Sequence, residues 1–130
     1  MQRRQSIDGV LAGARESFEQ LAPEDAYRAA QNGAVLVDIR SVDEQARQAA
    51  VIPGAVHHPL AVLLWRLDPD VPTHNPKLPL DARVILICRE GYCSSLAAAQ
   101  VREIGFEHAT DVIGGVAGWV AAGLPTEPWH

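Results

Sequence analysis

Residues 84–95 read VILICREGYCSS, and an alanine-rich run, residues 97–99, comes directly after them. The four apolar residues 84–87 are rich in β-branched side chains and predict a buried strand, whereas the two serines ahead of the alanines predict the start of a helix. The residues between them therefore form a tight turn, and its first residue is Cys88. A turn of this kind directs backbone N–H groups and the positive end of the helix into a small concavity, where a sulfur anion is favoured over a neutral thiol.

Holding Cys88 as a thiolate requires the whole turn. A free thiol titrates near pH 8.5, so ionisation at neutral pH needs a downward shift of about two units, or roughly 2.7 kcal/mol. A helix terminus supplies about 0.3–1 kcal/mol. We expect the remainder from the loop amides and from Arg89, through charge-assisted hydrogen bonds. Gly91 has no Cβ and lets the backbone turn these amides inward.

Composition narrows the class of protein. The chain has 130 residues, of which 48% are hydrophobic, so it is large enough to bury one core. A net charge of −5 argues against a nucleic-acid or anionic-membrane partner. The apolar stretch at residues 7–13 is too short and interrupted for a signal peptide, and no run of 18 apolar residues exists. We therefore expect a cytoplasmic protein whose two cysteines are thiols rather than a structural disulfide.

Helical and strand patterns alternate along the chain. Helices are predicted within residues 7–20, 23–32, 42–49, 60–67, 95–105 and 116–122, and strands at residues 35–39, 56–58, 84–87 and 110–113. Ser41 and Glu44 form the sequence pattern of a capping box for the third helix. Trp65 and Trp119 are expected in the core. This alternation predicts an α/β fold with a parallel sheet covered on both faces, in which ligands bind beyond the carboxyl ends of strands, where Cys88 lies.

Five short motifs add a family resemblance. They are VLVDIR at 35–40, IPGA at 52–55, Cys88 with Gly91 three residues on, Ser94 opening a helix that ends at Gly105, and Gly114-Gly115 followed by Trp119, Gly123 and Pro125. In this order and spacing the chain resembles the rhodanese family of single-domain sulfurtransferases. The resemblance implies a three-layer α/β/α sandwich with a mainly parallel sheet of about five strands. We expect residues 21–130 to form this rhodanese-like domain and residues 1–20 to form a helical extension.

The resemblance also implies an activity. Cys88 would take a sulfane sulfur from a donor anion such as thiosulfate as a persulfide and pass it to cyanide, a small thiol or a protein acceptor. Many members have Arg or Lys at the position of Cys93, so Arg89 and the loop amides would bind the donor here. The related phosphatases need an arginine six positions after the cysteine, and this position is Ser94.

The candidate site has three parts. Cys88 is the expected nucleophile in a covalent, two-step transfer. The donor-binding loop comprises Arg89, Glu90, Gly91, Tyr92, Cys93 and Ser94. Asp38 and Arg40 end a neighbouring strand and are expected to support the site as an ion pair. No metal or organic cofactor is expected, because the histidines share no ligand spacing.

Two other functions remain open at this point. Cys88 and Cys93 could cycle between dithiol and disulfide as a thiol-redox pair. Alternatively, the chain could be a catalytically silent module that binds an anion or a partner protein. The sequence leaves open the role of Cys93, the physiological donor and acceptor, and the oligomeric state.

Overall fold

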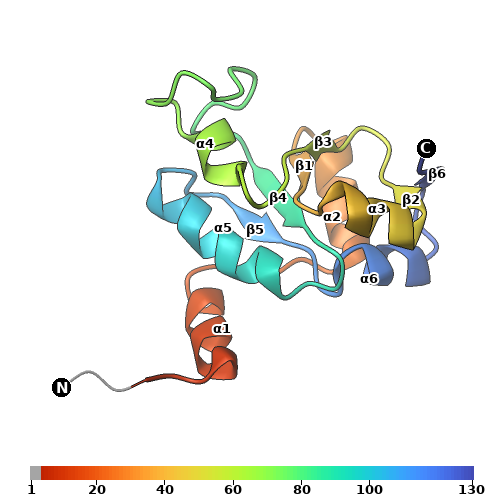
Figure 1. The fold of residues 1–130 in the computed structure, drawn as a ribbon, viewed down its shortest axis with the longest axis horizontal. Coiled ribbons are helices and arrows are strands. Elements are labelled where there is room, and N and C mark those ends of the chain that lie inside the picture. The colour runs from red at the N-terminus through yellow and green to blue at the C-terminus, as the bar shows by residue number, and fades with distance from the viewer. Residues whose placement is uncertain (1–3) are drawn as a thin grey trace.

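The computed structural model describes residues 4–130, and its centre is a parallel sheet of four short strands in the order β3-β1-β4-β5 (Figure 1). The strands are β1 (Val35–Asp38), β3 (Val56–His57), β4 (Val84–Ile87) and β5 (Thr110–Asp111). Val35 to Asp38 pair in register with Val84 to Ile87. Leu21 adds a single parallel bridge to Val112 beside β5. The predicted parallel sheet is therefore confirmed, with four strands and this bridge in place of about five strands.

The helices of the described residues 4–130 are α1 (Ile7–Arg15), α2 (Pro23–Gln31), α3 (Val42–Gln48), α4 (Leu63–Leu67), α5 (Cys93–Glu103) and α6 (Gly115–Ala121). The two faces of the sheet pack against different helices. On one face, side chains of α4 and α5 form a core with Val37, Leu86 and Phe106. On the other, α2 and α6 pack against Leu36 and Ile85. These three layers confirm the predicted sandwich, while α1 lies outside them against α5 (Figure 1).

Local signals place several helix ends correctly. Ser41 and Glu44 form the predicted capping box at the start of α3, with each side chain bonded to the other's backbone. Pro23 is the first residue of α2, where its missing N–H costs nothing. A small antiparallel pair, β2 (Ala50–Val51) with β6 (Glu127–Pro128), ties the C-terminal segment to the end of α3.

Other predictions about the elements were wrong in detail. Helix α5 begins at Cys93 rather than Ser95, and its N-cap residue, Tyr92, makes no side-chain cap. Helix α4 has five residues rather than eight, and Trp65 is 56% exposed instead of buried. Trp119 lies in the core as predicted, 1% exposed, and donates its indole N–H to the Pro125 carbonyl at 2.8 Å.

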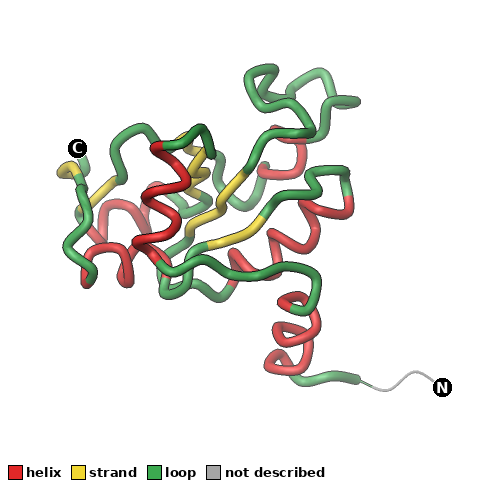
Figure 2. The backbone as a smooth tube through the Cα atoms, turned by 180° about the vertical axis from the view of Figure 1, so that it is seen from behind, coloured by secondary structure: helices red, strands yellow, loops and turns green. Residues whose placement is uncertain are grey.

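The remaining features concern the periphery of the molecule. Helix α1 ends at Arg15, earlier than residue 20, and Phe18 beyond it packs against the core. The proline-rich loop at residues 68–79 projects beyond α4 (Figure 2). Within residues 4–130, every helix falls short of the length and apolar character that a bilayer crossing requires. Residues 1–3 of the basic N-terminal stretch lie outside the described part.

Candidate active site

Cys88 follows the last residue of β4 at the carboxyl end of the sheet. Cys88 is 3% exposed, and it lines a pocket of about 280 Å³. The other lining residues are Glu44 of α3 and Arg89, Glu90, Tyr92 and Cys93 of the loop. Gly91 and Ser94, the remaining members of the predicted loop, are buried beneath this pocket. The structure thus brings all six loop residues around the sulfur, two below it and four at its opening.

Backbone and side-chain donors converge on the Cys88 sulfur. The Gly91 N–H donates to Sγ at 3.1 Å, and the Ser94 N–H donates to it as well. The Ser94 Oγ lies 3.2 Å from Sγ. Gly91 has φ +91°, and a Cβ built on it would lie 2.8 Å from the backbone N of Gly114. Only glycine fits this conformation and this close approach, so the inward turn of the amide depends on Gly91.

The start of α6 fixes the other side of the loop. The Val116 N–H donates to the Cys88 carbonyl at 2.8 Å, and the Ala117 N–H donates to the Arg89 carbonyl at 3.1 Å. A Cβ on Gly115, whose φ is +59°, would lie 2.4 Å from the Cys88 carbonyl oxygen. Because these carbonyls face α6, the N–H groups later in the loop are left to face the sulfur.

The hydrogen-bond donors lower the pKa of Cys88 to about 5. The largest contribution comes from the Cys93 thiol, which donates a hydrogen bond to the Cys88 sulfur, and smaller ones come from the Ser94 hydroxyl and from the Ser94 and Gly91 amides. Burial acts in the opposite direction, because it disfavours the charged sulfur. The donors outweigh this desolvation, so at neutral pH the sulfur is a thiolate.

Cys93 shows the opposite behaviour. Its hydrogen bond to Cys88, followed by partial burial, raises the pKa of the Cys93 thiol. Both cysteines are free, with Cys93 exposed at the start of α5. The site therefore holds an anionic sulfur and a neutral thiol side by side, which is the pairing expected of a nucleophile and its hydrogen-bond donor.

Asp38 and Arg40 form a buried ion pair at the carboxyl end of β1, the strand next to β4. The Arg40 Nη2 lies 2.7 Å from the Asp38 Oδ2. Arg40 also donates to the Ala50 carbonyl at 2.9 Å and to the Gln48 side chain at 3.0 Å. Gln48 in turn donates to the Arg89 carbonyl at 3.3 Å. The pair does not line the Cys88 pocket but connects to its loop through Gln48, so it braces the loop from α3.

Sequence reasoning missed a polar cluster below the sulfur. The Asp111 carboxylate is fully buried, and its Oδ2 accepts hydrogen bonds from the Ser94 and Ser95 hydroxyls, both at 2.7 Å. Arg15 donates to Ser95 and to the Gly91 carbonyl. The available signal was an aspartate in an otherwise apolar strand pattern, since a buried carboxylate needs partners. Within residues 4–130, no group of three or more His, Cys, Asp or Glu side chains is placed to hold a metal ion.

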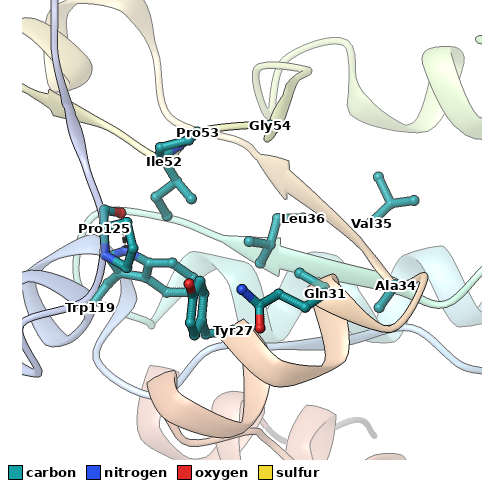
Figure 3. Close-up of a pocket in the computed structure, with 11 residues that line it drawn as sticks. Tyr27, Gln31, Ala34, Val35, Leu36, Ile52, Pro53, Gly54, Trp119 and Pro125 are labelled. Atoms are coloured by element: carbon teal, nitrogen blue, oxygen red, sulfur yellow. Dashed lines mark hydrogen bonds between the residues drawn. The ribbon is translucent and has the colours of Figure 1, made fainter.

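A larger pocket, of about 390 Å³, lies between α2, β1 and α6 (Figure 3). Tyr27 and Trp119 meet edge to face at its wall, with ring centroids 5.8 Å apart. Its described lining is apolar apart from Gln31 and Tyr27, and it includes neither Cys88 nor any charged side chain. A pocket without nucleophile or charge offers no chemistry for an anionic donor, so the Cys88 pocket remains the candidate active site.

Comparison with known proteins agrees with this geometry. A family model described as "Rhodanese-like domain" matches residues 22–122. A thiosulfate sulfurtransferase GlpE of Pseudomonas savastanoi pv. phaseolicola (strain 1448A / Race 6) is 34% identical over 107 residues, covering 80% of this chain and 89% of the relative.

Solved structures share the whole fold. A protein of unknown function from Rhodopseudomonas palustris CGA009, named as a possible tyrosine phosphatase, superposes with a TM-score of 0.87 at 28% identity, covering 98% of both chains. The polysulfide-sulfur transferase homodimer of Wolinella succinogenes has a TM-score of 0.72 at 25% identity, covering 92% of this chain and 85% of the other.

Proposed function

The chain belongs to the rhodanese-like domain family and is a rhodanese-type sulfurtransferase, and from this membership we propose that Cys88 carries the transferred sulfur as a persulfide. The donor is a sulfane-sulfur anion such as thiosulfate, and the acceptor is cyanide or a thiol, including a protein thiol. Arg89, Glu90, Gly91, Tyr92, Cys93 and Ser94 form the donor-binding loop, and Asp38 and Arg40 support it.

The reaction proceeds in two displacements. The Cys88 thiolate attacks the outer sulfur of thiosulfate, the S–S bond of the donor breaks, and sulfite leaves with the bonding electron pair. The negative charge then lies on the outer sulfur of Cys88–S–S⁻. Cyanide or a thiolate attacks this outer sulfur, the persulfide bond breaks, and the Cys88 thiolate is restored. No metal or organic cofactor takes part, and the two steps predict ping-pong kinetics.

One observation carries this proposal: the Gly91 N–H donates at 3.1 Å to a sulfur whose pKa is lowered to about 5, and the Ser94 amide contributes to the same effect. The same donors can stabilise the persulfide anion and the charge that develops between donor and acceptor. Such preorganised donors cost no rearrangement during the reaction. They therefore favour sulfur transfer over the role of an inert buried cysteine.

Phosphatase activity, which the name of the Rhodopseudomonas palustris protein suggests, does not fit this chain. Phosphoryl transfer depends on positioned positive charge around the phosphate. The position six residues after Cys88 is Ser94, which supplies no guanidinium.

Intact-mass analysis tests the proposal directly. Incubation with thiosulfate should add the mass of one sulfur atom, and cyanide should remove it. Cys88→Ala should show no addition, whereas Cys93→Ser should still be loaded. A wild-type chain that gains no sulfur under these conditions would refute the proposal, and a chain that also stays unchanged under mild oxidation would be a silent binding module.

A thiol-redox function is the second candidate, and the observation in its favour is that Cys88 and Cys93 line the same pocket as free thiols. Oxidation by a mild disulfide reagent would remove two hydrogens and join the two sulfurs, while the reagent is reduced to its thiol. If this disulfide forms and sulfur loading does not, the redox function replaces the transfer function.

We also propose a domain organisation and a cellular compartment. Residues 21–130 act as the rhodanese-like domain, and residues 1–20 form an N-terminal extension. The catalytic thiolate requires a reducing environment, because oxidising compartments join neighbouring thiols. Cytoplasmic residence is therefore the proposal that fits a free Cys88 beside a free Cys93.

A further inference from the structure

A continuous series of polar contacts joins the N-terminal helix to the nucleophile. It starts at Arg15 in the last turn of α1, passes through Ser95 to the buried Asp111, and continues through Ser94 to Cys88. The four distances are 2.9 Å from Arg15 Nε to Ser95 Oγ, 2.7 Å from Ser95 Oγ to Asp111 Oδ2, 2.7 Å from Ser94 Oγ to the same Oδ2, and 3.2 Å from Cys88 Sγ to Ser94 Oγ. Arg15 also donates from Nη2 to the Gly91 carbonyl at 2.9 Å.

The donors from the N-terminal segment fix the direction of the Ser95 hydroxyl. Arg15 Nε and, at 3.2 Å, Gln20 Nε2 both donate to the Ser95 Oγ. These bonds occupy the lone pairs of that oxygen, so its single proton is left for Asp111. A positive guanidinium thus reaches a buried carboxylate through one intervening hydroxyl, and its charge offsets the cost of burying Asp111.

Ser94 has two neighbours that both need its one proton. The Asp111 carboxylate and the Cys88 thiolate are both acceptors, and Ser94 can donate to one of them at a time. The Asp111 carboxylate depends strongly on the hydrogen bonds to its Oδ2, because its Oδ1 is buried and has no hydrogen-bond partner among the described residues. The 2.7 Å contact with Asp111 is shorter than the 3.2 Å contact with Sγ, so the carboxylate holds the Ser94 proton and its negative charge lies one hydroxyl away from the Cys88 sulfur.

We propose that Arg15 is a positioning residue of the sulfur site: through Ser95 it balances the Asp111 carboxylate, which lies one hydroxyl away from the Cys88 thiolate, and so limits the repulsion between the two negative charges. Its second bond, to the Gly91 carbonyl, holds the peptide whose neighbouring N–H lies on the sulfur. The N-terminal helix is then a working part of the site. This inference rests on the proposed function, since both concern the same thiolate.

Other titratable and charged groups near the sulfur also affect the pKa of Cys88. The Arg15 variant leaves all of them unchanged. The titratable and charged side chains that face Cys88 or its pocket are Glu44 of α3, Arg89, Glu90 and Tyr92 of the loop, Cys93 of α5 and Asp111 of β5. Arg15 does not line the pocket, so replacing it changes neither the opening nor the charges that a donor meets.

The test measures the rate of Cys88 alkylation by iodoacetamide against pH. Tryptic cleavage after Arg89 separates Cys88 from Cys93, so mass spectrometry reports the two thiols in different peptides. Arg15→Met should raise the pH midpoint of Cys88 alkylation by about one unit or more, because the sulfur faces an uncompensated carboxylate and the Gly91 carbonyl loses its bond to the guanidinium. Arg28→Met, which removes an exposed arginine from α2, is the matched control and should leave the midpoint unchanged.

A double variant distinguishes the proposed charge balance from simple packing of α1. Asp111→Asn in the Arg15→Met background removes the uncompensated charge and should return the midpoint toward the wild-type value. If Arg15→Met lowers the thermal midpoint but leaves the Cys88 pH midpoint in place, or if the double variant stays as shifted as Arg15→Met, the proposal is overturned. Sulfur loading of the wild-type chain is measured separately, so failure of this inference is distinguishable from failure of the transfer function.

Discussion

The ionisation of Cys88 depends on hydrogen-bond donors rather than on a cation in contact with the sulfur. With the pKa lowered to about 5, the thiolate dominates at neutral pH and is lost as the pH falls through about 5. Alkylation of Cys88 should therefore reach half its maximal rate near pH 5, well below the ordinary thiol value near 8.5. Because the pKa of Cys88 is lower in the folded than in the unfolded chain, its ionisation stabilises the fold. This contribution is complete above about pH 8.5 and is lost progressively as the pH falls to about 5. A midpoint near 8.5 would contradict the assigned donors.

Cys93 supplies the largest of these donors, and its removal has a defined effect. Cys93→Ala should raise the pKa of Cys88 by about one unit, because the sulfur loses one hydrogen bond. Cys93→Ser keeps an O–H donor and serves as the matched control, with a smaller shift. The pH profile of Cys88 alkylation measures both. Equal midpoints for the alanine and serine variants would show that the second thiol does not act as a donor.

The individual residues of the site were predictable to different degrees. Cys88 and Gly91 were predicted because a thiol and a glycine at a strand-to-helix turn have a specific physical meaning. Ser94 and Ser95 were interpreted as helix caps, yet both hydroxyls bond to Asp111 instead. Arg15 has the appearance of an ordinary basic residue at a helix end. Its contact with Gly91 spans 76 residues of sequence, and no local pattern encodes such a contact.

At the scale of elements, the junction between the Cys88 loop and the start of α6 determines the shape of the site. Gly115→Ala should disrupt it, because the new Cβ would lie 2.4 Å from the Cys88 carbonyl oxygen at a φ of +59°. We expect a loss of roughly 1–3 kcal/mol from backbone strain alone, with more from the clash. Sulfur loading should slow by at least about tenfold, because the inward amides move.

A second glycine provides the matched control for this variant. Gly123 also has a positive φ, +74°, but a Cβ there meets nothing within 4 Å. Gly123→Ala should therefore show strain without the clash and without slower sulfur loading. Urea denaturation measures the stability of both variants. If the two variants lose the same stability and both load sulfur at the wild-type rate, the packing of Gly115 does not shape the site.

The strands that are buried on both faces of the sheet could be predicted from the sequence. Strands β1 and β4 lie in the middle of the sheet and are covered on both faces, so a continuous run of apolar residues is enough to identify each of them. Strand β5 has two residues where four were expected, because only the Val112 N–H continues the bonding to β4, at 3.2 Å from the Leu86 carbonyl, whereas the Ile113 N–H donates to the Leu21 carbonyl at 2.8 Å. Helix α4 is shorter than its apolar run, since residues 60–62 form turns. Such boundaries depend on tertiary contacts rather than on local pattern.

On the scale of the whole molecule, the described part of the N-terminal segment, residues 4–20, is attached to the domain by contacts that reach the site and the core. Deletion of residues 1–20 removes the packing of Phe18 against the core and the bonds of Arg15 and Gln20 to Ser95. We expect a loss of about 2–4 kcal/mol in the free energy of unfolding, from one partly buried aromatic side chain and a few hydrogen bonds. Urea denaturation checks this value. Deletion of residues 1–5, which precede the Ser6 cap of α1, is the control and should cost little.

The contact between the Cys88 carbonyl and the N–H of Val116 has a consequence for synthesis of the chain. During translation, Cys88 leaves the ribosome well before residues 115–117 do, so for that interval the nascent chain carries an ordinary, weakly acidic cysteine. Its chemical character as a reactive sulfur arises only when the last quarter of the polypeptide has been made and has docked. A truncated product that stops before α6 lacks these bonds, so its Cys88 should alkylate at neutral pH as slowly as an ordinary thiol.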